Sequence, residues 1–197
     1  MENLVRHSHE KIKIAVSGTA KTDFLTQESL DLLVQVGTEI AHQGAVIVSG
    51  ATTGVPLWSA KGAKEAGGFS IGISPATDEK EHLEYYKLPL DYMDVIIYTG
   101  QGYAGRDILM IRAADAVVIG PGRIGTIHEF TVSFEDNKPI GILESDKWET
   151  DEIIKMILEK SHRAQDNTKI IYDTDPTKLV KRLIELVKID KSSLGTH

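Results

Sequence analysis

Residues 115–130 carry the groups best suited to hold a negatively charged ligand. An apolar run at 116–119 leads into a glycine-rich turn at 120–125, and a helical pattern follows. Glycines let the backbone approach a ligand closely, and the free amides at a helix start attract an anion. Glu129 lies about one turn into the expected helix, where its carboxylate can face the same ligand. This segment therefore predicts an anion site with an acidic group beside it.

Three further glycine-containing segments follow expected strands, at 17–19, 49–54 and 100–105. Ligands of open parallel sheets collect beyond the carboxyl ends of the strands, so we expect the four segments to share one pocket. The residues assigned to ligand or phosphate binding are Gly18, Thr19, Gly50, Ala51, Gly54, Gly102, Gly120, Gly122, Arg123, Gly125 and Thr126.

Arg106 begins the helix after the third segment, where the helix dipole already disfavours a cation. Such a position is explained by a nearby anion, or by a surface ion pair with Asp107 or Asp136. The preceding segment, 100–105, matches G-x-G-x-x-G. The next expected strand lacks the acidic residue that would hold a ribose, so a pocket-lining loop is favoured over a dinucleotide site.

Two structural alternatives concern residues 126–129. Thr126 and Glu129 match a capping box, in which the glutamate returns to the amide of the capping threonine. A glutamate could also do both, capping the helix in the empty state and turning to a sugar hydroxyl when ligand arrives. The sequence leaves both roles of Glu129 open.

The elements that must position these groups are short β-branched runs separated by helical patterns. Continuous apolar strands alternating with helices predict a parallel sheet covered on both faces. We expect one Rossmann-like α/β domain over residues 1–197, with a doubly wound, mainly parallel sheet of about six or seven strands. Residues 1–10 are expected to be flexible, and residues 78–91 to hold a short helix. The expected strands are 12–16, 45–48, 69–73, 94–98, 116–119, 139–143 and 169–172, and the last two helices cover 151–159 and 176–187.

Composition excludes several classes of function. The chain has 197 residues, a net charge of −7 and no cysteine, which rules out disulfides and thiolate chemistry. An acidic surface disfavours nucleic acid. The histidines have no metal-ligand spacing beyond His7 and His9, and we expect no metal site. No apolar run resembles a signal or a membrane span, so a cytoplasmic protein is expected.

The chain resembles the superfamily of LOG cytokinin-activating phosphoribohydrolases, also called "lysine decarboxylase-like" or SLOG proteins, and their relatives among molybdenum-cofactor carriers and DprA. Residues 121–129, P-G-R-I-G-T-I-H-E, are similar to the LOG motif P-G-G-x-G-T-x-x-E, and 49–54 to its second-strand loop. Arg106 falls at the family's functional arginine. The resemblance covers residues 11–145.

The resemblance implies cleavage of the N-glycosidic bond of a nucleoside 5′-monophosphate, with Glu129 and Arg106 as catalytic residues and no required cofactor. It also implies a homodimer. Three departures point toward the molybdenum-cofactor carrier branch: Arg123 replaces the second glycine, His128 stands where LOG enzymes carry an acid, and A-G-R-D replaces M-H-x-R-K around Arg106. The alternative is therefore a carrier or sensor of a molybdopterin-type or other nucleotide-like ligand.

Overall fold

A computed structural model describes residues 10–194 of the chain. It contains seven strands: β1 (Lys13–Ser17), β2 (Val46–Ser49), β3 (Phe69–Ser74), β4 (Val95–Tyr98), β5 (Ala116–Ile119), β6 (Ile140–Leu143) and β7 (Ile170–Asp173). The helices are α1 (Gln27–His42), α2 (Val55–Glu65), α3 (Glu79–Glu84), α4 (Gly102–Ala113), α5 (Ile124–Glu135), α6 (Thr150–Lys160) and α7 (Pro176–Leu194). Except for Glu10, the expected flexible segment lies outside the described residues.

The strands form one parallel sheet in the order β4-β3-β2-β1-β5-β6-β7. Each expected strand is present with its ends shifted by no more than one residue, and the predicted fold class is confirmed. The order changes direction beside β1, which pairs with both β2 and β5. Ligands of open α/β sheets bind beyond the strand ends at such a switch point.

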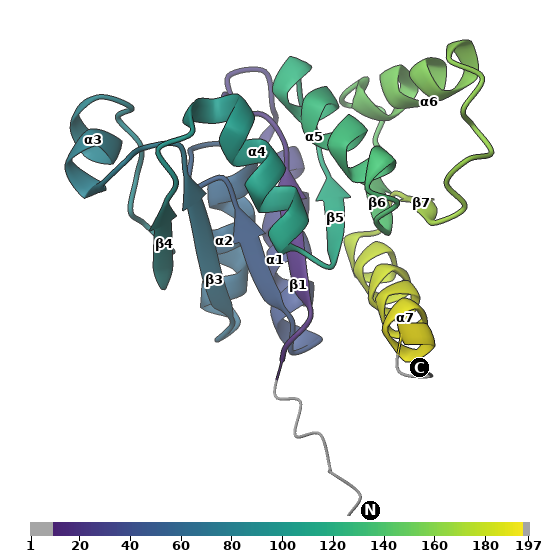
Figure 1. Cartoon of the computed structure of the whole chain (residues 1–197), viewed down its shortest axis with the longest axis horizontal. Coiled ribbons are helices and arrows are strands. Elements are labelled where there is room, and N and C mark those ends of the chain that lie inside the picture. Colours follow the sequence, from purple (N-terminus) through teal and green to yellow (C-terminus); the bar gives the residue numbers. More distant parts are fainter. Residues whose placement is uncertain (1–9, 195–197) are drawn as a thin grey trace, which may run out of the picture.

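Helices cover both faces of the sheet (Figure 1). One apolar cluster joins the sheet to α1, α2 and α7, and a second joins the opposite face to α4, α5 and α6. Strands β2, β5 and β6 are buried along their whole length, which explains why their sequences are almost entirely apolar.

The edge strand β4 is less well covered than the central strands. The short helix α3, expected within residues 78–91, lies beside β4 (Figure 1). Its buried His82 contacts the Ser74 hydroxyl through Nδ1 at 2.8 Å and the Pro89 carbonyl through Nε2 at 3.1 Å. The first contact fastens α3 to the end of β3, and the second fastens it to the segment that follows α3. From β4 the chain returns across the sheet as α4, which brings the first turn of α4 to the switch point.

Candidate functional site

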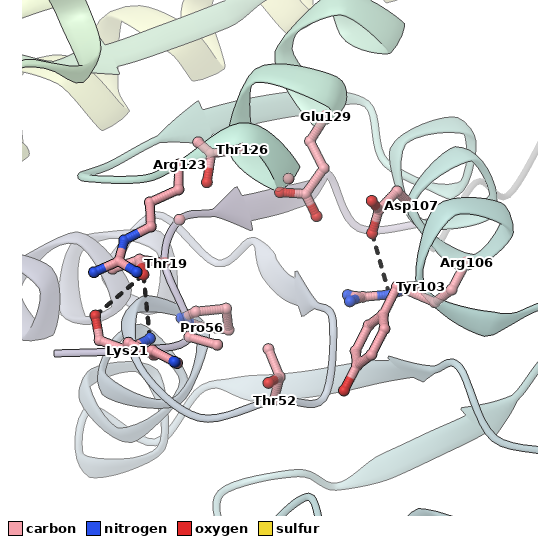
Figure 2. A pocket seen from close by; sticks show the side chains of 13 residues that line it. Thr19, Lys21, Thr52, Pro56, Tyr103, Arg106, Asp107, Arg123, Thr126 and Glu129 are labelled. Carbon is pink, nitrogen blue, oxygen red and sulfur yellow. Dashed lines mark hydrogen bonds and ion pairs between the residues drawn. The ribbon is translucent and has the colours of Figure 1, made fainter. Parts of the chain in front are cut away.

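A cavity of about 300 Å³ lies beyond the ends of β1 and β5 (Figure 2). Its walls come from the β1–α1 and β2–α2 connections, the first turns of α2 and α4, and the first two turns of α5. The four glycine-containing segments that we expected to share one pocket each contribute to this wall. The lining residues are Gly18, Thr19, Ala20, Lys21, Thr52, Pro56, Tyr103, Arg106, Asp107, Arg123, Gly125, Thr126 and Glu129.

Two cations stand at one end of the cavity. Figure 2 shows Lys21 and Arg123 on the side away from Arg106 and Tyr103. The guanidinium of Arg123 packs over the ring of Phe24, 4.9 Å from its centroid. Arg123 is also the residue before α5, and no side chain caps this helix start. The positive helix end and two cations together favour an anion at this end.

Glu129 projects into the cavity from the second turn of α5 and is only 7% exposed. The hydroxyl of Ser17, at the end of β1, donates a hydrogen bond to its Oε2. Burial, and after it the negative charge of Asp107, raise the pKa of Glu129 to about 8 against the opposing effects of Arg106 and Ser17. A carboxyl with this pKa holds its proton at neutral pH.

The start of α5 also decides whether Thr126 and Glu129 form a capping box. Since α5 begins at Ile124, Thr126 lies inside the helix and is not its cap. Glu129 is bonded to Ser17 instead of returning to the helix start. The capping-box alternative is therefore wrong, and Glu129 is held by the neighbouring strand end.

Arg106 is buried in the wall of the cavity, with 5% of its surface exposed. Its guanidinium lies against the backbone of Gly50, where a Cβ atom would come within 1.4 Å of Nη1. Its Nε is 3.3 Å from Asp107 Oδ1, outside hydrogen-bond geometry, and Nη1 donates a weak hydrogen bond to the sulfur of Met110, at 3.9 Å. Arg106 thus retains donors for a ligand. The expected partner Asp107 is found, but in a buried site and not on the surface, while Asp136 pairs with Arg112.

Asp107 and His128 occupy two of the positions at which the chain departs from the LOG motifs, and they contact each other. His128 Nδ1 lies 3.1 Å from Asp107 Oδ2. The motif has a lysine at the position of Asp107 and an acid at that of His128. The two departures are therefore coupled in space, and they place a carboxylate where the motif has a cation.

Several predicted ligand residues lie outside the cavity wall. Gly50 makes room for Arg106, and the buried Ala51 follows it with a positive φ of 49°. Gly102 begins α4, and Gly120 donates its amide to the Ser17 carbonyl. Gly54 has a φ of 75° and packs against the Thr19 carbonyl. These residues shape the loops, and those that both were predicted and line the cavity are Gly18, Thr19, Arg106, Arg123, Gly125, Thr126 and Glu129.

Gly122 belongs to a second, neighbouring cavity of about 550 Å³, which it shares with Arg123. Its amide donates to the Thr150 hydroxyl at 2.8 Å, and a Cβ atom would collide with the Thr126 side chain. Arg123 therefore stands between two cavities.

Sequence reasoning did not assign Lys21, Thr52, Tyr103 or Asp107 to the site. Tyr103 occupies a variable position of the G-x-G-x-x-G segment, and no sequence pattern shows which way it faces. Asp107 had a visible signal, because it follows Arg106 at the expected helix start. That expected start is wrong, since α4 begins at Gly102 and both residues lie in its second turn. Ser17 belongs to the glycine-containing segment 17–19 but was not assigned to the site, and the structure shows it bonded to Glu129.

Two further features concern the described residues, 10–194. Within that range no helix is both long and apolar enough to cross a membrane. The same residues include no group of three or more acidic, histidine or cysteine side chains arranged to hold a metal ion.

Known proteins with similar sequences indicate the family to which the chain belongs. The family model of the SLOG cluster4 family matches residues 11–180. An uncharacterised protein of Archaeoglobus fulgidus is 31% identical over 133 residues, covering 68% of this chain and 80% of the relative.

Two solved structures are similar over nearly their whole length. The molybdenum cofactor binding protein of Rippkaea orientalis has a TM-score of 0.72 at 26% identity, covering 92% of this chain and 98% of its own. The molybdenum cofactor carrier protein of Chlamydomonas reinhardtii has a TM-score of 0.72 at 25% identity, covering 91% and 99%. The resemblance inferred from the glycine-rich motifs is confirmed, and the chain belongs to the SLOG cluster4 family.

Proposed function

We propose that this protein binds a phosphorylated nucleotide or nucleotide-like ligand in the cavity beyond β1 and β5. The observation that carries the proposal is the placement of Lys21, Arg123 and the uncapped start of α5 at one end, with Glu129 and Arg106 further along the cavity. A phosphate suits the first group, because helix-end amides and cations both favour it. A ribose suits the second, because carboxyl and guanidinium groups hydrogen-bond hydroxyls. The solved structures of molybdenum cofactor proteins support a ligand of this class.

The first test is to identify what the purified protein holds and then to measure binding. Native mass spectrometry reports any retained small molecule without assuming a reaction. Formycin 5′-monophosphate is a suitable ligand for calorimetry, because its C-glycosidic bond cannot be hydrolysed as an N-glycosidic bond is. We expect Arg123→Ala to weaken its binding about tenfold, as loss of one charge-assisted phosphate contact.

The control for this variant is Lys160→Ala, which removes an exposed cation from α6. Equal affinity in wild type and Arg123→Ala would show that Arg123 is not part of the phosphate site. Absence of binding to the wild-type protein at millimolar ligand would contradict the proposed function itself.

Hydrolysis of the N-glycosidic bond is the candidate activity favoured by Glu129. In that reaction the bond from C1′ to the base nitrogen breaks, the hydroxyl of a water joins C1′, and the base takes up a proton from Glu129, which is restored by the proton that the water releases. Glu129 holds a proton at neutral pH and lines the cavity beside Arg106. It is suited to donate that proton to the leaving base. Release of free base from a panel of nucleoside 5′-monophosphates, lost in Glu129→Gln, is the expected result.

A non-catalytic carrier or sensor is the second candidate, favoured by likeness to the two molybdenum cofactor proteins. Neither candidate requires a further cofactor. A carrier predicts tight binding with no release of base from any nucleotide in the panel. Turnover at a rate that depends on Glu129 would exclude a purely carrying role.

We also propose a cytoplasmic homodimer. Strand β4 is at the sheet edge, and Val95 and Ile97 on it are 43% and 49% exposed. Phe69, on β3, and Leu109, on α4, are exposed to similar extents, so apolar surface extends across three elements. Light scattering after size exclusion tests the dimer, and Ile97→Lys should shift it toward monomer. A monomeric wild-type protein at micromolar concentration would refute it.

A further inference from the structure

The end of the cavity opposite the two cations is formed by an aromatic side chain. Tyr103 lies in the first turn of α4, lines the cavity and is 51% exposed. Figure 2 shows its ring between Arg106 and Thr52, across the cavity from Lys21 and Arg123. A half-exposed tyrosine at the wall of a polar cavity has aromatic surface that no part of the described chain covers.

Contacts with neighbouring side chains hold the ring in place. The ring of Tyr86 meets that of Tyr103 at right angles, with centroids 5.4 Å apart, and Tyr85 meets Tyr86 at 4.9 Å. The guanidinium of Arg106 lies 5.9 Å from the Tyr103 centroid. A ring fixed in this way loses little further freedom when a flat ligand group stacks on it, which favours binding.

We propose that Tyr103 is the stacking platform for a planar heteroaromatic ring, so that the ligand lies along the cavity with its phosphate at Lys21 and Arg123 and its base at Tyr103. Glu129 then faces the sugar between them. This assignment rests on the proposed function and adds to it the orientation of the ligand and the residue that selects for a base. It holds for a purine or for a fused pterin ring, since both present a π-face.

The order of groups along the cavity supports this orientation. Phosphate, sugar and base follow one another in a nucleotide, and the cations, Glu129 and Tyr103 follow one another in the wall (Figure 2). The reverse orientation would place the base among Lys21, Arg123 and the positive end of α5, and would leave the phosphate beside Asp107. The cation at that end, Arg106, lies 3.3 Å from Asp107, whose charge offsets its own, so the end with Lys21 and Arg123 is the better place for the phosphate.

The test compares two ligands that differ by the base, formycin 5′-monophosphate and ribose 5-phosphate, by calorimetry. In wild type the nucleotide should bind more tightly than ribose 5-phosphate. Tyr103→Leu should weaken binding of the nucleotide by about five- to a hundredfold, the range for loss of one base–aromatic stack. The affinity for ribose 5-phosphate should stay the same. Tyr103→Phe should retain nucleotide binding, and Tyr92→Leu, which changes a 40% exposed ring outside the cavity wall, serves as the matched control.

The outcomes separate this assignment from the proposed function. If both ligands bind and Tyr103→Leu leaves their affinity ratio unchanged, the stacking role is wrong while the phosphate site stands. Equal wild-type affinities for the two ligands would also overturn it. If neither ligand binds, the proposed function fails together with this orientation. Circular dichroism of Tyr103→Leu confirms folding, which a half-exposed position should tolerate.

Discussion

The raised pKa of Glu129 makes the stability of this protein depend on pH in a direction that can be measured. The folded chain holds the Glu129 proton up to about pH 8, whereas an unfolded chain releases it near 4.5. Between these values the folded state binds more protons, so its stability falls as pH rises. The contribution is fully present below pH 4.5 and is lost as pH rises through 8.

The size of the effect follows from the difference between the two pKa values. One pH unit corresponds to about 1.4 kcal/mol, so the full loss between pH 4.5 and 8 is at most roughly 5 kcal/mol. Glu129→Gln has no such proton to lose. We therefore expect the stability of this variant relative to wild type to rise with pH by up to about 1.4 kcal/mol per pH unit, whichever of the two is more stable at pH 5.

Urea denaturation of both proteins at intervals from pH 5 to 9 measures this difference. Taking the difference between the two proteins cancels the titration of all groups they share. Glu185→Gln, at an exposed position of α7, controls for the loss of one carboxyl elsewhere. A difference between wild type and Glu129→Gln that stays constant from pH 5 to 8 would show that Glu129 is already ionised, and would refute the reasoning.

Two further predictions concern neighbours of the site. Asp107→Asn removes a negative charge near Glu129, so the Glu129 pKa should fall by about one pH unit yet stay above 4.5, because burial remains. Carbon-13 NMR titration of the Glu129 carboxyl measures this pKa. An unchanged pKa would mean that Asp107 has no influence on it. Gly54→Ala should destabilise the fold by about 3 kcal/mol or more, since its φ is 75° and a Cβ atom would lie 2.1 Å from a carbonyl oxygen. Gly44→Ala, with a φ of 71° but open space, should cost only about 1 kcal/mol, and equal thermal shifts for the two would contradict the steric explanation.

Most of the fold could be predicted because periodicity reports burial directly. Residues 116–119 are continuously apolar, and the strand they form is buried on both faces. The ends of helices were harder. The sequence around Thr126 fits a cap, yet α5 begins at Ile124 and Glu129 accepts a hydrogen bond from Ser17 instead. Ser17 is 112 residues away in the sequence, so no local pattern could show that contact.

The candidate site was predictable where backbone geometry dictates the residue type and less so where side chains meet. Glycine at 50 is required because the guanidinium of Arg106 occupies the space of a Cβ atom. The sequence marks such a glycine as unusual but cannot say whether a ligand or a side chain fills the space. The same limit applies to Tyr103, whose role depends on how α4 crosses the sheet.

The carboxylate of Asp107 changes what Glu129 can do for a ligand. A lysine at position 107, as in the LOG motif, would favour an ionised Glu129, whereas the carboxylate found here favours its protonated form. A protonated carboxyl donates a hydrogen bond to a sugar oxygen, and an ionised one adds a negative charge to a cavity that must hold a phosphate. We therefore expect the affinity for formycin 5′-monophosphate to fall as pH rises through about 8 in wild type but not in Glu129→Gln.

Calorimetry from pH 6 to 9.5 on both proteins measures this difference, since titration of the phosphate and of other shared groups affects the two alike. Affinity that rises with pH in wild type alone would mean that the ionised Glu129 is the binding form. In that case the carboxylate would be suited to stabilise positive charge on the ribose, as the LOG resemblance implies. The direction of the pH dependence thus decides which protonation state of Glu129 the ligand meets, whether or not the ligand is then hydrolysed.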